Sequence, residues 1–323
     1  MRTITLEEHF VTPAFLDGPG RDFHQNMVKS GGDRAAKIFE QLCDLGARRL
    51  AEMDAAGIDV QVLSLNYPGT EQSEAADAIA AASETNDVLA EAVKKNPARF
   101  AGLAALPTAA PDKAVEELDR RVRQNGFKGA VINGHNRGRY LDDKFYWPIL
   151  ECAEALKVPI YLHPTLPPKA VIAASYGGFS PDMSFLLAGP GWGWHIETAT
   201  HVIRMVLGGI FDRYPKLQIV VGHMGEGLPF MLPRLEALGH ATKLQRSLGD
   251  YLRQNIHYTF AGFNFPATFL NLLLEVGSDR IMFSVDYPYG SMKDALAFLR
   301  QIPVSATDRA RIAHGNAERL FGL

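Results

Sequence analysis

The stretch TITLEEHF, residues 3–10, alternates apolar and polar side chains and ends in two glutamates and a histidine. Alternation with a period of two predicts a β-strand with one face packed against the core. Carboxylates at the end of a buried strand need a partner, because an unpaired buried charge is costly. This stretch therefore predicts a first strand whose C-terminal end carries a functional site.

Seven further apolar runs follow, most of them separated by segments with helical periodicity. The predicted strands are 3–8, 60–65, 100–107, 129–134, 158–164, 217–225, 256–262 and 281–288, and the predicted helices include 34–56, 74–96, 112–125, 143–156, 194–208 and 292–300. Eight strands that alternate with helices predict an α/β fold, a (β/α)₈ TIM barrel, formed as one domain over residues 1–323. An open doubly wound sheet is the alternative, but no glycine-rich phosphate loop follows the first strand. The Gly- and Pro-rich segments 11–33 and 165–193 are expected to be long loops over the catalytic face.

Composition excludes several classes of protein. The chain has 47% hydrophobic and 21% charged residues and a net charge of −3. We therefore expect no nucleic-acid partner, no membrane association and a cytoplasmic location, because there is no basic excess, no long apolar run and no signal peptide. Cys43 and Cys152 are expected to be free thiols in a reducing compartment.

Polar residues gather at the predicted strand ends. In barrel enzymes the active site is built at the C-terminal ends of the strands. The residues at these ends are Glu7, Glu8, His9, Asn66, Asn133, His163, His223 and Asp286, with Glu226 three residues after His223. Each follows an apolar run, so burial is expected and partners are needed.

Periodicity separates the two glutamates of the first strand. The even-numbered apolar residues would pack under the helices, so the odd-numbered residues point into the barrel. This predicts that Glu7 and His9 face the interior and that Glu8 lies at the rim.

Four of the strand-end residues form a metal-ligand set. Glu7 and Asp286 would supply two negative charges, and His9 and His163 two neutral imidazoles. The two carboxylates would neutralise one divalent cation, and mixed nitrogen and oxygen ligands suit Zn²⁺ or Mn²⁺. The sequence therefore predicts one divalent metal ion, although any single buried histidine is more commonly a core residue.

His223 and Glu226 in GHMGEG are predicted to form a hydrogen-bonded pair. A carboxylate partner fixes the tautomer of an imidazole and raises its basicity. The pair is interpreted as a general acid–base dyad or as a support for the metal ligands, with a purely structural hydrogen bond as the alternative.

Several blocks of sequence resemble one known family. LEEHF, YLHP, GHMGEGLPF, FSVDYP and the closing HGNAERLFGL are together similar to the amidohydrolase superfamily, in its aminocarboxymuconate semialdehyde decarboxylase-type branch. Within that branch the greatest likeness is to the γ-resorcylate (dihydroxybenzoate) decarboxylases. The resemblance implies that Glu7, His9, His163 and Asp286 are metal ligands and that His223, with Glu226 beside it, is catalytic. It also implies that Arg234 helps to build the active site of a neighbouring subunit, in a homodimer or homotetramer.

The resemblance implies the reversible, non-oxidative decarboxylation of an ortho-hydroxylated aromatic acid. In this hypothesis Asp286 gives the proton to the ring and the pair of His223 and Glu226 polarises the phenol. The predicted substrate-binding residues are Phe23, Asn66, Tyr287 and Arg234, and Trp192 and Tyr289 are further aromatic candidates. Two alternatives stay open: a hydrolase of an amide, ester or lactone that uses a metal-activated water, and a catalytically silent metal-binding protein.

Overall fold

The computed structural model describes residues 1–29 and 31–323 in full and the backbone alone at position 30. Its strands pair in parallel throughout. They are β1 (Ile4–Phe10), β2 (Val60–Leu65), β3 (Phe100–Gly102), β4 (Ala104–Ala105), β5 (Ala130–Asn133), β6 (Ile160–His163), β7 (Ile219–Val221), β8 (Ile256–Thr259) and β9 (Ile281–Met282). Each of the eight predicted strands is confirmed, and the third is divided into β3 and β4.

The strands follow one another around a barrel. β1, β2 and β3 form one sheet, and β4 to β9 form the other in chain order. The two sheets join at Leu103. Its N–H donates to the carbonyl of Leu63 in β2, and the next N–H, that of Ala104, donates to the carbonyl of Gly129, just before β5. On the other side a parallel bridge joins Leu6 to Ser284, and the Ser284 hydroxyl donates to the Leu6 carbonyl at 2.6 Å. The fold is the predicted (β/α)₈ barrel.

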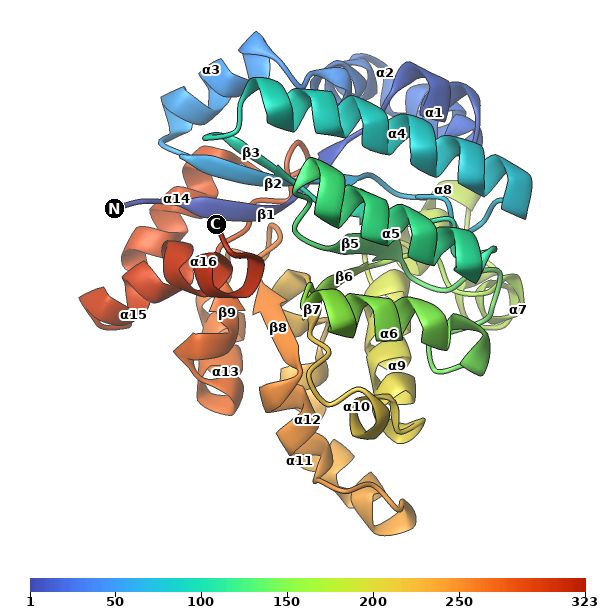
Figure 1. Cartoon of the computed structure of the whole chain (residues 1–323), viewed down its shortest axis with the longest axis vertical. Coiled ribbons are helices and arrows are strands. Elements are labelled where there is room, and N and C mark those ends of the chain that lie inside the picture. Colours follow the sequence, from blue (N-terminus) through green and yellow to red (C-terminus); the bar gives the residue numbers. More distant parts are fainter.

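Helices surround the strands, as Figure 1 shows. The predicted helices are found as α4 (Ala75–Lys95), α5 (Pro111–Asn125), η1 (Lys144–Tyr146) with α6 (Trp147–Leu156), α9 (Gly193–Leu207) and α14 (Met292–Gln301). The segment predicted as one helix over 34–56 is instead the end of α2 (Arg21–Cys43) followed by α3 (Ala47–Ala56). The break lies where Asp44 accepts from the N–H of Gly46, an Asx-type contact that competes with the helix.

The two segments expected to be long loops are largely helical. They contain α1 (Pro13–Asp17), the first half of α2, α7 (Lys169–Val171), η2 (Ile172–Tyr176) and α8 (Pro181–Ala188). The prediction was wrong because two of the prolines mark helix starts: Pro13 and Pro181 occupy the first helical position, behind the capping hydroxyls of Thr12 and Ser180. In Figure 1 both segments lie on the side toward which β1 runs.

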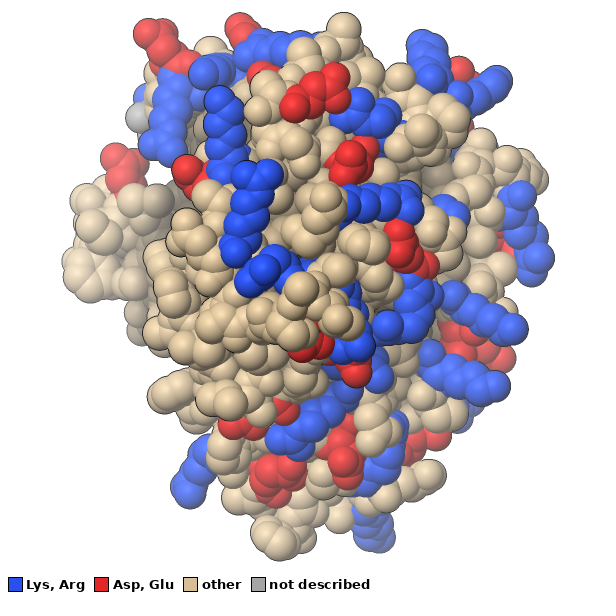
Figure 2. All heavy atoms as spheres, turned by 90° about the vertical axis from the view of Figure 1, so that its left-hand side faces the viewer, with Lys and Arg blue, Asp and Glu red and all other residues tan. Residues whose placement is uncertain are grey.

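The rest of the chain is also mainly helical. It forms α10 (Ile210–Arg213), η3 (His223–Gly225), α11 (Leu228–Leu235), η4 (Glu236–Ala241), α12 (Leu248–Gln254), α13 (Pro266–Val276), η5 (Ser278–Arg280), α15 (Ala306–Ala310), η6 (Arg311–Gly315) and α16 (Asn316–Phe321). Within the described residues, no helix has the length and apolar character needed to cross a membrane. The face in Figure 2 carries positive and negative side chains interspersed.

A bulge in β1 overturns one prediction. The register with β2 shifts between Thr5 and Glu8, and Glu7 takes a φ of 61°. Glu8 is consequently fully buried rather than at the rim: its carboxylate accepts the N–H of Val285 at 3.0 Å and the amide of Gln61 at 3.2 Å. Glu8 therefore connects the first strand to both of its neighbours in the barrel.

Candidate metal centre and acid–base cluster

The four predicted metal ligands converge at the C-terminal ends of β1, β6 and β9. His9 Nε2 lies 3.1 Å from Asp286 Oδ1, and His163 Nε2 lies 3.4 Å from Glu7 Oε1. The rings of His9 and His163 meet edge to face with centroids 4.9 Å apart. Glu7, His9 and His163 are buried, whereas the Asp286 side chain is 19% exposed and so faces the opening.

The orientation of these atoms fits a divalent cation. Glu7 Oε1 is buried and makes no hydrogen bond within the described part of the chain. His163 Nδ1 lies 2.8 Å from the Pro164 carbonyl, so Nδ1 carries the proton and the Nε2 lone pair faces Glu7. The hydroxyl of Tyr161 donates to the other oxygen, Glu7 Oε2, and fixes the plane of that carboxylate. Two nitrogen and two oxygen donors of this kind match the preferences of Zn²⁺ and Mn²⁺.

Burial shifts the titration of all four groups toward their neutral forms. Burial, together with the nearby Asp286, raises the pKa of Glu7 to about 8, and burial raises the pKa of Asp286 to about 7. Burial also lowers the pKa of His9 to about 3 and takes the pKa of His163 well below its usual value. Neutral imidazoles are the form that binds a metal, and a cation would offset the cost of ionising the two carboxyls.

The backbone is strained at the ends of these strands. Glu7, His223, Glu226 and Asp286 all have left-handed φ values, between 48° and 67°. Such a conformation costs non-glycine residues of the order of 1–3 kcal/mol and clusters at functional sites. The position before His223 is occupied by a glycine, Gly222, and a Cβ there would lie only 2.4 Å from Glu7 Oε2. The chain thus brings β7 directly against the first predicted ligand.

Glu226 joins two histidines beside the four ligands. His223 Nδ1 lies 2.7 Å from Glu226 Oε1, as predicted, and His195 Nδ1 lies 2.5 Å from Oε2. Although burial opposes both charges, the carboxylates of Glu226 and Glu7 raise the pKa of His223 to about 10, and the two histidines lower the pKa of Glu226 to about 2. His195 lies in the first turn of α9 and is not at the end of a strand.

The chain resembles known proteins over nearly its whole length. The amidohydrolase family model matches residues 15–323. The chain belongs to the amidohydrolase family. The γ-resorcylate decarboxylase of Polaromonas sp. (strain JS666) is 37% identical, covering 99% of this chain and 98% of that protein. The γ-resorcylate decarboxylase of Rhizobium sp. (strain MTP-10005) is 39% identical, with the same coverage of both chains.

Solved structures of related enzymes extend the likeness to the whole amidohydrolase fold. A 2,6-dihydroxybenzoate decarboxylase complexed with 2,6-dihydroxybenzoate superposes with a TM-score of 0.89 at 36% identity, covering 100% of both chains. A dihydroxybenzoic acid decarboxylase from Polaromonas sp. JS666, with manganese and the inhibitor 2-nitroresorcinol bound, has a TM-score of 0.90 at 37% identity, covering 100% of this chain and 97% of that one. The resemblance inferred from the sequence is confirmed.

Aromatic rings surround the cluster of this amidohydrolase. Tyr289 lies 5.9 Å from the ring of His9, and its hydroxyl donates to Asn66 at 3.1 Å. Phe263 lies 5.3 Å from the His223 ring, and Trp194 lies 6.4 Å from the His163 ring. Asn66 therefore lies beside the cluster, as predicted. The sequence interpretation missed Trp194 and Phe263, although the clustered aromatics of GWGWH and GFNF were a signal for both.

Phe23 and Tyr67 form an outer part of the same wall. The Phe23 ring lies 5.5 Å from Tyr67, which lies 5.9 Å from Trp194. Phe23 is therefore separated from the cluster by the rings of Tyr67 and Trp194. Trp192, another aromatic candidate, is 54% exposed.

Tyr287 does not face the cluster, which corrects its assignment as a substrate contact. Its hydroxyl donates to Glu52 at 2.8 Å, and its ring lies 4.5 Å from the guanidinium of Arg49. Both partners belong to α3, on the outer side of the barrel. Asp286 and Tyr287 lie just beyond β9, where Asp286 has a left-handed φ of 67°, and the two side chains face opposite sides of the barrel wall.

Arg234 is exposed on α11, at the lower end of the molecule in Figure 1. Large apolar side chains lie near it: Phe230 is 75% exposed and Met231 is 45% exposed on the same helix. α11 contacts α13, where Leu274 is 82% exposed. Arg234 thus shares its helix with two exposed apolar side chains, and a third lies on the helix that α11 contacts.

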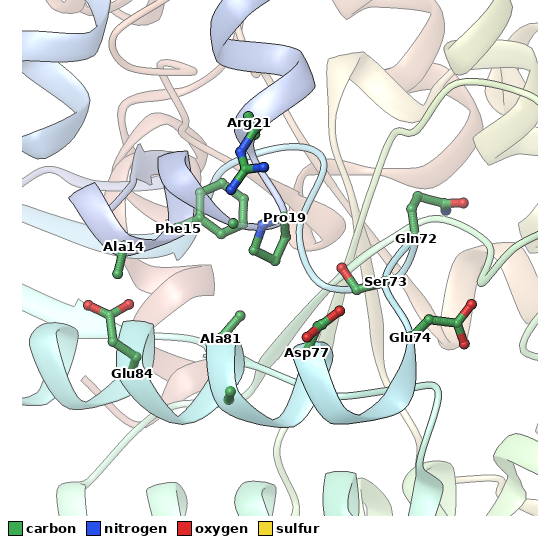
Figure 3. Close-up of a pocket in the computed structure, with 12 residues that line it drawn as sticks. Ala14, Phe15, Pro19, Arg21, Gln72, Ser73, Glu74, Asp77, Ala81 and Glu84 are labelled. Carbon is green, nitrogen blue, oxygen red and sulfur yellow. The ribbon is translucent and has the colours of Figure 1, made fainter.

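A groove of about 750 Å³ between α1 and α4 is separate from the cluster (Figure 3). Two of the carboxylates that line it are paired, since Glu74 binds Arg137 at 2.5 Å and Glu84 accepts from Thr12 at 2.6 Å. The groove lining contains none of the predicted ligands. The groove and the cluster at the strand ends are therefore different parts of the molecule.

Proposed function

We propose that this protein is a metal-dependent, non-oxidative decarboxylase of an ortho-hydroxylated aromatic carboxylic acid. The observation that carries the proposal is the convergence of Glu7, His9, His163 and Asp286 beside the pair of His223 and Glu226. The full-length relatives named γ-resorcylate decarboxylase support the same activity. The reaction needs an anchor for the carboxylate, a proton donor and a partner for the phenol oxygen, and this cluster provides residues for each role.

Glu7, His9, His163 and Asp286 would hold one divalent cation, Mn²⁺ or Zn²⁺. The manganese bound in the structure of a related decarboxylase supports Mn²⁺. The cation would supply Lewis acidity and a fixed point of attachment for the carboxylate and the adjacent phenolate. Two of these residues are themselves held in place: Glu7 accepts a hydrogen bond from Tyr161, and His163 donates one to the Pro164 carbonyl.

Asp286 is the proposed proton donor. Its side chain is 19% exposed, and burial raises its pKa to about 7 when no cation is bound, so this carboxyl takes up a proton more readily than an exposed one. Transfer of that proton to the ring carbon that bears the carboxylate breaks the aromaticity of the ring. The bond from this carbon to the carboxylate then breaks, its electron pair returns to the ring, and CO₂ leaves. Asp286 regains its proton from water, and the same steps in reverse carboxylate the phenol.

His223 is proposed to bind the phenol oxygen. Its Nδ1–H donates to Glu226, which leaves Nε2, 3.8 Å from Glu7 Oε1, directed toward the metal centre. Trp194, Phe263 and Tyr289 would stack against or border the flat ring of the substrate. Asn66 orients Tyr289 through its hydrogen bond.

We also propose that the protein works as a homodimer or homotetramer, in which Arg234 contributes to the site of a neighbouring subunit. The exposed side chains of Phe230 and Met231 on the same helix, and of Leu274 on the neighbouring α13, support an interface, because large exposed apolar side chains commonly mark protein–protein contacts.

A substrate panel tests the activity. Protein loaded with Mn²⁺ or Zn²⁺ is incubated with 2,6- and 2,3-dihydroxybenzoate, salicylate, 5-carboxyvanillate and the para-hydroxy isomers, with loss of acid and formation of phenol followed by chromatography. Turnover confined to ortho-hydroxy acids, and absent in Asp286→Asn, is the expected result. No turnover across the panel by protein that holds one equivalent of metal would contradict the proposal and favour hydrolysis of lactones or amides.

A further inference from the structure

We infer that His195 is a positioning residue for the decarboxylation: it holds the carboxylate of Glu226 in place and thereby fixes the orientation of His223. The inference rests on the proposed function and assigns a role to a residue that the metal centre does not use. It is carried by the geometry of three side chains that come from α9, from the end of β7 and from the turn that follows.

The carboxylate of Glu226 has one imidazole donor for each oxygen. His223 Nδ1 lies 2.7 Å from Oε1 and His195 Nδ1 lies 2.5 Å from Oε2. The Glu226 side chain is fully buried, and among the described residues these are the side-chain hydrogen bonds it receives. Because each nitrogen faces its own oxygen, these hydrogen bonds explain the cluster without a second cation.

The surroundings of His195 define which nitrogen carries the proton. The Glu226 carboxylate can only accept, so the Nδ1 of His195 carries the proton in their 2.5 Å contact. The other nitrogen, Nε2, lies 3.2 Å from the indole nitrogen of Trp194 and 3.1 Å from the Pro190 carbonyl. The His195 ring also packs on His223, with centroids 4.7 Å apart, and on Phe263 at 5.3 Å. His195 is thus held by three rings in the one orientation that directs its N–H at the carboxylate.

Loss of this donor would leave Oε2 of Glu226 buried and unpaired. A buried carboxylate in that position either rotates to share its remaining donor or takes up a proton. Both responses weaken the Nδ1–H···O bond that fixes His223. The free Nε2 of His223 would then no longer be held toward the position of the phenol oxygen.

Two variants of the metal-loaded protein separate this role from a packing role. His195→Leu fills the space but has no donor, and His195→Asn can place an amide N–H where Nδ1 lies. We expect His195→Leu to lower kcat about 10- to 100-fold with KM changed less than about threefold, which is the scale for residues that orient a reacting group. His195→Asn should recover kcat to within about fivefold of the native value.

His314→Leu is the matched control. It removes an equivalent histidine–glutamate contact, from His314 Nδ1 to Glu318 at 3.0 Å. Glu318 also binds Arg2, just before β1, so this contact lies at the opposite end of the barrel from His9. kcat should stay native in this variant.

A second readout does not depend on turnover. In protein labelled with ¹⁵N-histidine, the buried Nδ1–H of His223 should give a far-downfield proton resonance, assigned by its loss in His223→Asn. We expect this resonance to be lost or shifted in His195→Leu and kept in His195→Asn. An unchanged resonance in His195→Leu, or equal kcat in the Leu and Asn variants, would overturn the inference. A native protein inactive on the whole substrate panel would refute the proposed function alone, because the resonance still tests the contact.

Discussion

His9 and Asp286 meet with Nε2 and Oδ1 3.1 Å apart, although 277 residues separate them in the chain. The contact lies beside the seam where Leu6 bridges to Ser284 and joins the two ends of the barrel. Formation of this contact therefore requires closure of the fold, because one proposed ligand lies in the first strand and the other lies just after the last strand. A lone pair and a carboxylate oxygen at this distance need a proton or a cation between them.

Replacement of Asp286 by Asn should stop turnover while substrate analogues still bind. The amide keeps the size and one oxygen of the side chain but cannot give up the proton, and loss of a general acid costs about 10²- to 10⁴-fold in rate. Metal content is measured first, because Asp286 is also a proposed ligand. Binding of 2-nitroresorcinol then reports the integrity of the pocket. Turnover near the native rate in protein with full metal would remove Asp286 as the acid.

Gly222→Ala should weaken metal binding without preventing folding. The backbone of Gly222, with φ −81° and ψ −167°, suits alanine, but the new Cβ would lie 2.4 Å from Glu7 Oε2. The carboxylate must move away, and we expect the affinity for Mn²⁺ to fall about 10- to 100-fold, measured by calorimetric titration of metal-free protein. Gly315→Ala is the control, since the nearest atom to its Cβ is 3.9 Å away. Native affinity in Gly222→Ala would show that Glu7 Oε2 need not stay in place.

The sequence predicted which four strand-end residues converge because that information is local. Strand periodicity and the rule that barrel sites lie at strand ends selected Glu7, His9, His163 and Asp286, and no tertiary detail was needed. The same periodicity failed one residue later, at Glu8. A bulge inserts a residue into one strand of a pair, and the left-handed φ of Glu7 that creates it is not encoded by a glycine.

Other parts of the site depend on how distant elements dock. His195 meets Glu226 because the first turn of α9 packs over the end of β7, and no sequence spacing reports that contact. Tyr287 was misassigned from its position next to Asp286, where alternation predicts the opposite face. The helices within 165–193 were missed because glycine and proline were interpreted as loop residues and not as helix boundaries.

Glu8→Gln should remove a pH-dependent loss of stability. Burial raises the pKa of Glu8 from 4.5 to about 8, so the folded state binds a proton that the unfolded chain releases. For a carboxyl with a raised pKa, stability is fully present below pH 4.5 and declines as the pH rises toward about 8. Glutamine stays neutral, keeps an acceptor for Val285 N–H, and can pair with the free Oε1 of a rotated Gln61. The Tm of the variant should therefore fall less than that of the native protein over this range.

Glu8→Ala provides the contrast. It leaves the N–H of Val285 and the amide of Gln61 without their acceptor, so we expect a loss of about 1–3 kcal/mol in the free energy of unfolding, measured in urea. If Glu8→Gln and the native protein show parallel Tm curves, the carboxylate does not titrate in the predicted range.

Arg234→Ala should impair activity across subunits while the protomer stays folded. Arg234 is exposed on α11, so its loss should not affect the core. A hydrogen bond from a charged group to substrate or to the neighbouring site corresponds to about a 10- to 100-fold loss of kcat/KM. Arg300→Ala, an exposed arginine on α14, is the control and should keep native activity. Light scattering gives the mass of each assembly.

Mixed assemblies decide whether Arg234 acts in trans. Co-expression of Arg234→Ala with Asp286→Asn produces mixed dimers in which one site receives both defects and the other receives neither. In a symmetric dimer with random pairing, activity should recover to about one quarter of native, because half of the dimers are mixed and half of their sites are intact. Two separately inactive variants that stay inactive when co-expressed would place Arg234 in its own subunit's site or outside any site. Native activity and native mass for Arg234→Ala alone would make it an ordinary surface charge.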